Sequence, residues 1–124
     1  MLALVVSGAT IVASGALHLY LWGRADGYRA VPTIGPLFLA QGAAGLLLGV
    51  ALVAARRTVV TLAGAVFMAL SIGGLVVSVN GELFGYPETL NAPYVKMALG
   101  IEIAGLIVCL ATCLHQAMTK QSTR

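Results

Sequence analysis

Four long apolar segments, separated by short polar connections, account for nearly all of this chain of 124 residues. They cover residues 2–22, 34–55, 59–79 and 94–114. A helix rises about 1.5 Å per residue and the hydrocarbon core of a bilayer is about 30 Å thick, so about 20 residues suffice for one crossing. None of the segments alternates as a barrel strand does, and a helix satisfies its own backbone hydrogen bonds in lipid. The pattern therefore predicts four transmembrane helices.

The composition agrees with this prediction and leaves no room for a second domain. The chain is 60% hydrophobic and only 9% charged, with a mean hydropathy of +0.99. Its connections are too short to form a soluble domain, so residues 1–124 are expected to be one unit. We predict an all-α integral membrane four-helix bundle with antiparallel up-down topology and short loops. The brief turn at Arg56 and Arg57 predicts that the second and third segments are antiparallel neighbours.

The basic residues predict the orientation of the bundle, because Lys and Arg are enriched in cytoplasmic loops. The second connection and the C-terminal tail carry four of them and no acidic residue, namely Arg56, Arg57, Lys120 and Arg124. The other two connections carry Arg24 and Arg29, with Lys96 just inside the last segment. Both termini are therefore predicted to be cytoplasmic in a multi-pass protein of the cell membrane. The richness in Ala, Gly and Val is typical of a bacterial protein.

Glu102 is the most informative single residue, because it lies well inside the fourth segment. If that helix starts at Tyr94, Glu102 lies about 12 Å below the outer boundary of the membrane. A carboxylate at such a depth costs at least about 2.5 kcal/mol, so it must be protonated, paired or exposed to water. An ionisable residue in this position indicates a functional site unless a structural partner explains it.

Each of the other three segments also places a polar side chain in its outer half. These are His18 in the first segment, Gln41 in the second and Asn80 at the end of the third. Together with Glu102, and with Arg29 at the rim, they form the predicted binding site, which would open outward. The inner half of the bundle is almost uniformly apolar.

Each of these residues also has a structural interpretation. Glu102 and His18 would form a pair that joins the first and fourth helices, and Gln41 would make a hydrogen bond between helices. Arg29 would extend along the surface toward the lipid head groups. The aromatic residues near the outer boundary would form an interfacial belt, namely Tyr20, Trp22, Tyr28, Tyr86 and Tyr94.

Small residues recur at helical spacing within the segments. Gly45 and Gly49 form a GxxxG pair in the second segment, and Ala65, Ala69 and Gly73 form a ridge on the third. Small side chains let helix backbones approach closely in lipid. We expect packing within the bundle, with dimerisation through one of these ridges as the alternative.

The sequence contains no motif for catalysis, for a metal or for a cofactor. Cys109 and Cys113 share a helix face, but His115 lies about 200° round the helix from Cys113, so the three cannot bind one metal. His18 and His115 lie at opposite ends of the predicted bundle, which excludes a haem held by both. No Ser-His-Asp set, phosphate-binding loop or Cys-x-x-Cys motif is present. We predict no enzymatic activity, no cofactor and no binding of nucleic acid.

Two functions remain open at this stage. The first is an accessory or assembly subunit of a membrane complex, or an outward-facing module that binds a lipid or another small molecule. The alternative is a proton-coupled transporter of small molecules that acts as an oligomer through Glu102. The expected partners are the lipid bilayer, a lipid or small molecule, and another membrane protein or a second copy of the chain.

Overall fold

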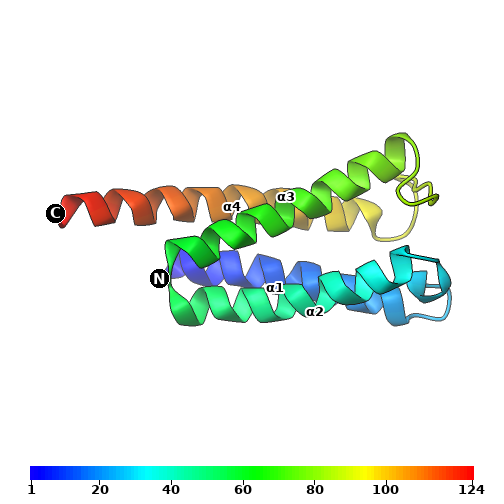
Figure 1. Ribbon diagram of the computed structural model, residues 1–124, viewed down its shortest axis with the longest axis horizontal. Helices are drawn as coiled ribbons and strands as arrows, with labels where there is room; N and C mark the ends of the chain where they lie inside the picture. The colour runs from blue at the N-terminus through cyan, green and yellow to red at the C-terminus, as the bar shows by residue number, and fades with distance from the viewer.

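The computed structural model describes every residue from Met1 to Arg124 and is built from helices alone. The four α-helices are α1 (Leu2–Gly23), α2 (Ile34–Ala55), α3 (Thr58–Asn80) and α4 (Val95–Ser122), and a short 3-10 helix, η1 (Tyr28–Ala30), lies in the first connection (Figure 1). All four α-helices are long and apolar enough to cross a membrane. The predicted all-α, four-helix membrane architecture is therefore confirmed.

The helices run alternately up and down, which gives the bundle two distinct ends (Figure 1). We call the end with the α1–α2 and α3–α4 connections the loop end. The opposite end, which we call the terminal end, has both chain termini and the α2–α3 turn at Arg56 and Arg57. Both longer connections thus lie on the same side of the bundle.

The predicted limits of the helices are accurate except at the end of α4. The predicted segment stops at residue 114, whereas the helix continues to Ser122 and projects beyond the rest of the bundle (Figure 1). Hydropathy falls after Leu114, but Met118, Lys120 and Gln121 all favour a helix. The hydrophobic pattern thus marks the end of the apolar segment and not the end of the helix.

Helices α1 and α2 pack tightly through glycines on both sides of their interface. A Cβ atom on Gly15 would lie 2.8 Å from the carbonyl oxygen of Gly42 and 3.0 Å from the Cα atom of Gly45. A Cβ atom on Gly49 would likewise lie 2.7 Å from the carbonyl oxygen of Gly8. Backbones this close leave no room for a side chain, so Gly45 and Gly49 serve packing within the bundle.

Helices α1 and α4 are joined by polar side chains as well as apolar ones. Near the terminal end, the hydroxyl groups of Ser7 and Thr112 lie 3.0 Å apart, and both side chains are buried. Thr112 also donates to the carbonyl oxygen of Val108, at 2.8 Å. Because hydrocarbon offers no competing partner, such bonds help to hold membrane helices together.

The fully apolar core fills the centre of the bundle. It consists of Ile11, Leu52, Ala65, Met68 and Cys109, so every helix contributes to it. Cys109 is a free and fully buried thiol, which agrees with a packing role for this residue.

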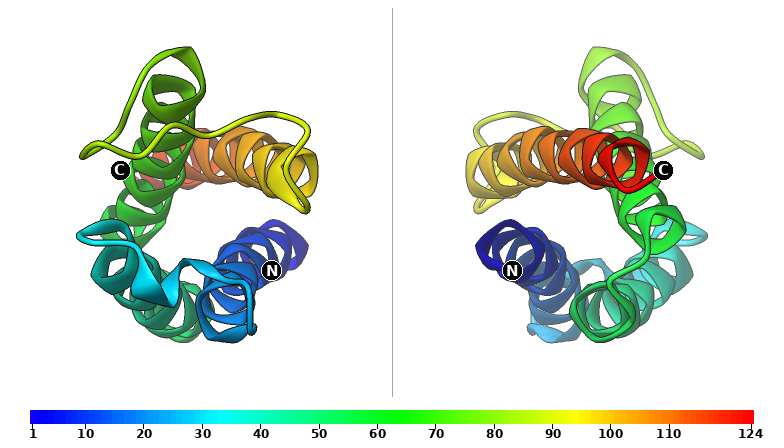
Figure 2. Two further views of the ribbon diagram at one scale, coloured as in Figure 1. Left: turned by 90° about the vertical axis from the view of Figure 1, so that its right-hand side faces the viewer. Right: turned by 90° about the vertical axis from the view of Figure 1, so that its left-hand side faces the viewer.

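Helices α2 and α3 are antiparallel neighbours joined by a short turn, as predicted, but their backbones are close over only part of their length. Toward the loop end α3 diverges from α2, as Figures 1 and 2 show. The most extensive contacts join α1 with α2 and α3 with α4, and α1–α4 contacts connect the two pairs. A short turn fixes antiparallel direction, whereas the glycine surface of α2 is used by α1.

Candidate functional site

A cavity of about 240 Å³ lies at the loop end of the bundle, between all four helices and below the two connections. Eleven of its 18 lining residues are hydrophobic, so its wall is mainly apolar with a few polar groups. This is the usual composition of a site for a small molecule.

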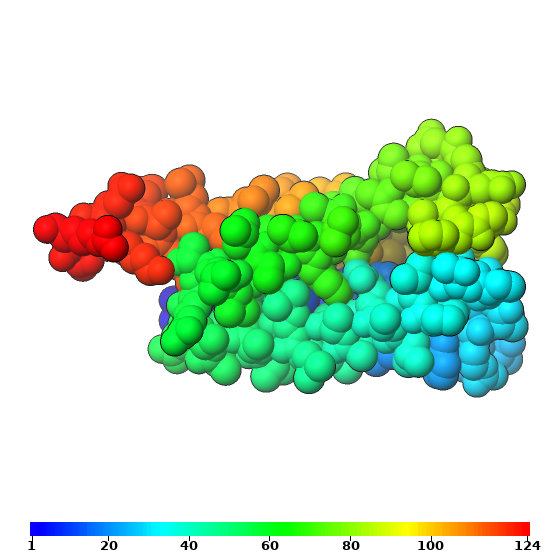
Figure 3. All heavy atoms as spheres, viewed as in Figure 1, coloured from blue at the N-terminus to red at the C-terminus, as the bar shows by residue number.

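The cavity reaches the side of the bundle where α2 and α3 diverge. Figure 3 shows a hollow between these helices, through which atoms of the helices behind them are visible. Each of these helices contributes an exposed apolar residue to the lining of the cavity, since Leu37 of α2 is 42% exposed and Leu70 of α3 is 70% exposed. Both helices are long and apolar enough to cross a membrane, in which this hollow would face the lipid chains.

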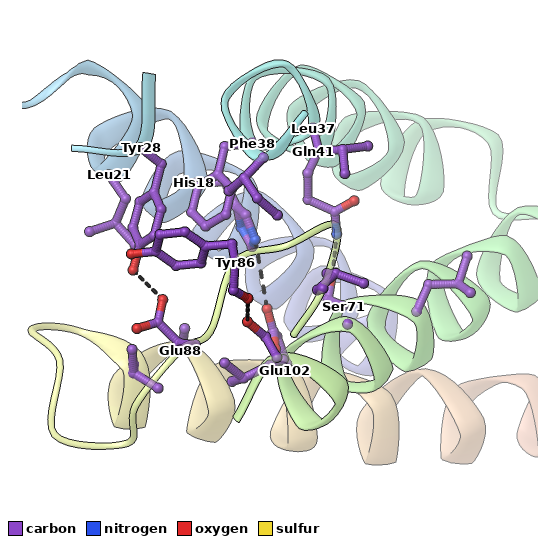
Figure 4. Close-up of a pocket in the computed structure, with 18 residues that line it drawn as sticks. His18, Leu21, Tyr28, Leu37, Phe38, Gln41, Ser71, Tyr86, Glu88 and Glu102 are labelled. Carbon is purple, nitrogen blue, oxygen red and sulfur yellow. Dashed lines mark hydrogen bonds and ion pairs between the residues drawn. The ribbon is translucent and has the colours of Figure 1, made fainter. Parts of the chain in front are cut away.

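Glu102 and His18 meet at the wall of the cavity formed by α4 and α1 (Figure 4). The Nε2 atom of His18 lies 4.0 Å from the Oε1 atom of Glu102, and Glu102 is only 2% exposed. This distance is too long for a direct hydrogen bond. The Oε2 atom of Glu102 is buried and has no hydrogen-bond partner. The carboxyl group is therefore desolvated and poorly paired.

The position of the protons on His18 follows from its second contact. Its Nδ1 atom lies 2.8 Å from the carbonyl oxygen of Ser14, which can only accept, so Nδ1 carries a hydrogen and donates. In the neutral imidazole, Nε2 then presents a lone pair toward Glu102. The two residues thus face each other as acceptors unless a further proton lies between them.

Gln41 makes the only side-chain hydrogen bond between α2 and α3. Its amide nitrogen donates to the hydroxyl oxygen of Ser71, and both residues line the cavity (Figure 4). The bond lies where the two helices have begun to diverge, so it ties the open side of the bundle together.

The two connections form a roof over the cavity. The hydroxyl group of Tyr28 in η1 donates to Glu88 in the α3–α4 connection (Figure 4). The Tyr28 ring stacks on Phe38 of α2, with centroids 4.3 Å apart, and meets the Tyr86 ring edge to face. Ser78 fixes the other side of the roof, since its hydroxyl group donates to the carbonyl oxygen of Tyr86 at 2.9 Å.

A tight turn in the α3–α4 connection directs the chain back toward the bundle. The backbones of Leu83 and Tyr86 exchange two hydrogen bonds, at 3.0 and 2.9 Å. Between them, Phe84 and Gly85 both have positive φ, at 50° and 79°, as a two-residue turn of this kind requires. The turn places Tyr86 and Glu88 above the cavity.

Burial changes the acid–base behaviour of the roof. Desolvation raises the pKa of Tyr28, and the hydrogen bond to the Glu88 carboxylate raises it further. Desolvation also raises the pKa of Tyr86. Both phenols therefore stay neutral well into the alkaline range.

The structure brings three of the five predicted site residues together. His18, Gln41 and Glu102 all line the cavity. Asn80 does not, because it is exposed and its amide donates to the carbonyl oxygen of Val76 on its own helix. Arg29 is also outside, with its guanidinium group over the Trp22 ring at 5.7 Å. The position of a residue along its helix predicts its depth in the membrane, but not the direction of its side chain.

Several lining residues were not predicted as members of the site. Ser71 and Ser78 carry no sequence signal, since a serine in an apolar helix commonly bonds to its own backbone. Tyr28 and Tyr86 were predicted as members of an interfacial belt, and the structure places both among the residues that line the cavity. The signal that could have found them is the similar Gly-Tyr pair before the second and fourth segments.

The remaining chemistry of the chain offers no metal centre. No group of three or more His, Cys, Asp or Glu residues is placed to hold a metal ion.

Comparisons with protein-family models, with curated proteins and with solved structures gave no match. The function must therefore be argued from the cavity.

Proposed function

We propose that the protein is a membrane-embedded binding module that takes an amphiphilic small molecule, such as a lipid, from the outer leaflet of the cell membrane. The observation that carries this proposal is the cavity at the loop end, which reaches the lipid-facing side between α2 and α3. A molecule dissolved in the bilayer would enter there without passing through water. Its polar part would then lie near Glu102 and His18.

The burial of the Glu102 carboxyl group without a hydrogen-bond partner supports a role in binding. A buried carboxyl group with an unpartnered oxygen is costly in a membrane span, so its retention is easier to explain if a ligand provides the missing partner. The mainly apolar wall would supply the hydrophobic contribution to affinity.

Transport is the weaker alternative for this arrangement. Carrying a substrate across the membrane requires access to the site from both sides. The lining residues all belong to the two connections or to the loop-end half of the helices. The apolar core, which includes Ile11, Leu52 and Met68, fills the bundle beyond them. We therefore favour binding, either by the protein alone or as a subunit of a larger complex.

Native mass spectrometry of the protein extracted gently from its own membranes tests the proposal. We expect an additional small mass on the wild-type protein. The mass should be lost in Gly74→Leu, which places a large side chain in the wall beside Leu83. Gly73→Leu is the matched control, since Gly73 has open space around it. An additional polypeptide without a small ligand would favour the accessory subunit, and a bare protein would contradict binding.

A further inference from the structure

The atoms that His18 and an ionised Glu102 present to each other at the cavity wall are both hydrogen-bond acceptors. In the neutral imidazole, His18 Nε2 is an acceptor because Nδ1 donates to Ser14. Both oxygens of an ionised Glu102 are acceptors, and Oε2 has no partner. Gln41 donates one of its two amide hydrogens to Ser71, and its carbonyl oxygen is a further acceptor. What the facing pair of Glu102 and His18 lacks is a donor between them.

The charged residues that line the cavity also favour a cationic ligand. No Lys or Arg is among the lining residues, whereas two carboxyl groups, Glu88 and Glu102, are. The nearby Arg24 is bonded to Asp26 at 2.6 Å. An anionic head group, such as a phosphate or a carboxylate, would find no Lys or Arg partner here.

From these observations we infer that the ligand is an amphiphile whose head is a protonated primary amine, an inference that rests on the proposed binding function. The geometry of the pair supports this head. Two acceptors 4.0 Å apart can both lie about 2.8 Å from one nitrogen that sits between them. A primary ammonium carries three hydrogens, so it would bond to His18, Glu102 and one further acceptor.

Other head groups satisfy the site less well. A hydroxyl group has one hydrogen and can donate to only one of the two facing acceptors. A quaternary ammonium has the right charge but no hydrogen to donate. The apolar body of the ligand would lie along Phe38 and leave between Leu37 and Leu70, toward the lipid.

Calorimetric titration in nanodiscs of zwitterionic lipid tests the head group directly. Four probes share one eight-carbon chain, namely octylammonium, octanol, octyltrimethylammonium and octanoate, and empty nanodiscs correct for partition into lipid. At neutral pH we expect octylammonium to bind at a single site, about tenfold or more tighter than the other three. The preference should fall about tenfold in Glu102→Gln and stay unchanged in Glu82→Gln, an exposed residue outside the cavity.

The outcomes separate this inference from the proposed function. If the alcohol or the carboxylate binds as tightly as octylammonium, and Gly74→Leu still abolishes binding, the amine head is wrong and the cavity remains a binding site. If no probe binds saturably, or Gly74→Leu binds as well as the wild type, both proposals fail. The ranking of the four probes on the wild-type protein keeps the inference testable even if Glu102→Gln does not fold.

Discussion

Glu102 of α4 and His18 of α1 face each other across 4.0 Å, in contact range for charges but too far apart for a hydrogen bond. A pair selected to hold two helices together would be closer, as Ser7 and Thr112 are at 3.0 Å on the same two helices. In contrast to the bonded hydroxyl groups of Ser7 and Thr112, the Oε2 atom of Glu102 has no hydrogen-bond partner. We interpret the pair as a site that is kept open for a third group.

This interpretation predicts that Glu102 contributes little to stability. Replacing a buried, poorly paired charge by a group of similar size is commonly neutral or stabilising. We expect the free energy of unfolding to change by less than about 1 kcal/mol in Glu102→Gln and to rise by up to about 2 kcal/mol in Glu102→Leu. Thermal unfolding in nanodiscs measures both variants. A loss of about 3 kcal/mol or more would identify the structural pair instead.

The glycine interface of α1 and α2 predicts a sharp contrast between two glycine variants. In Gly15→Ala the added methyl group would lie 2.8 Å from the backbone of α2, so the helices must move apart, and we expect a loss of about 1–3 kcal/mol. In Gly73→Ala nothing lies within 4 Å, so we expect a gain of up to about 1 kcal/mol from helix propensity. Equal effects in unfolding titrations would contradict this assignment of the interface.

The sequence predicts the helices of this fold well because apolar length is a direct consequence of bilayer thickness. It also indicates that His18, Gln41 and Glu102 belong to one level of the bundle. It cannot show that Asn80 turns away or that α3 leaves α2, because both depend on which helix faces pack. The roof residues Tyr28 and Glu88 meet only after two connections have folded toward each other.

Gln41 and Ser71 provide a test of the open side of the bundle. Their hydrogen bond is the only one between side chains of α2 and α3, so a double-mutant cycle with Gln41→Leu and Ser71→Ala should give a coupling energy of about 0.6–1.7 kcal/mol. Unfolding in mixed micelles supplies the four free energies. A coupling energy near zero would mean that other contacts hold α2 and α3 together at this level.

The predicted orientation places the roof of the cavity outside the cell. Asp26 and Thr123 are exposed at opposite ends of the bundle, so single cysteines at these positions report on the two sides of the membrane. With Cys109 and Cys113 replaced by alanine, a membrane-impermeant maleimide should label Asp26→Cys in intact cells and Thr123→Cys only after permeabilisation. The reverse pattern would place the cavity in the inner leaflet.

The contacts of Tyr28 in the roof also predict that its phenol deprotonates only at strongly alkaline pH. Desolvation, followed by its bond to Glu88, raises its pKa above the ordinary value of about 10, so the fold favours the neutral phenol. This contribution to stability is complete below about pH 10 and is lost as the pH rises through the folded-state pKa. In a tyrosinate absorbance titration, Tyr28→Phe should therefore remove intensity only from the most alkaline part of the curve.

Two further variants identify the source of that shift. Glu88→Gln removes the carboxylate that accepts from Tyr28, so the late titration should move toward lower pH while desolvation keeps it above the ordinary range. Glu82→Gln makes the same change of charge on an exposed residue outside the cavity and should leave the curve unaltered. If Tyr28→Phe instead removes absorbance near pH 10, the phenol is in water, and the two connections do not close over the cavity in the membrane.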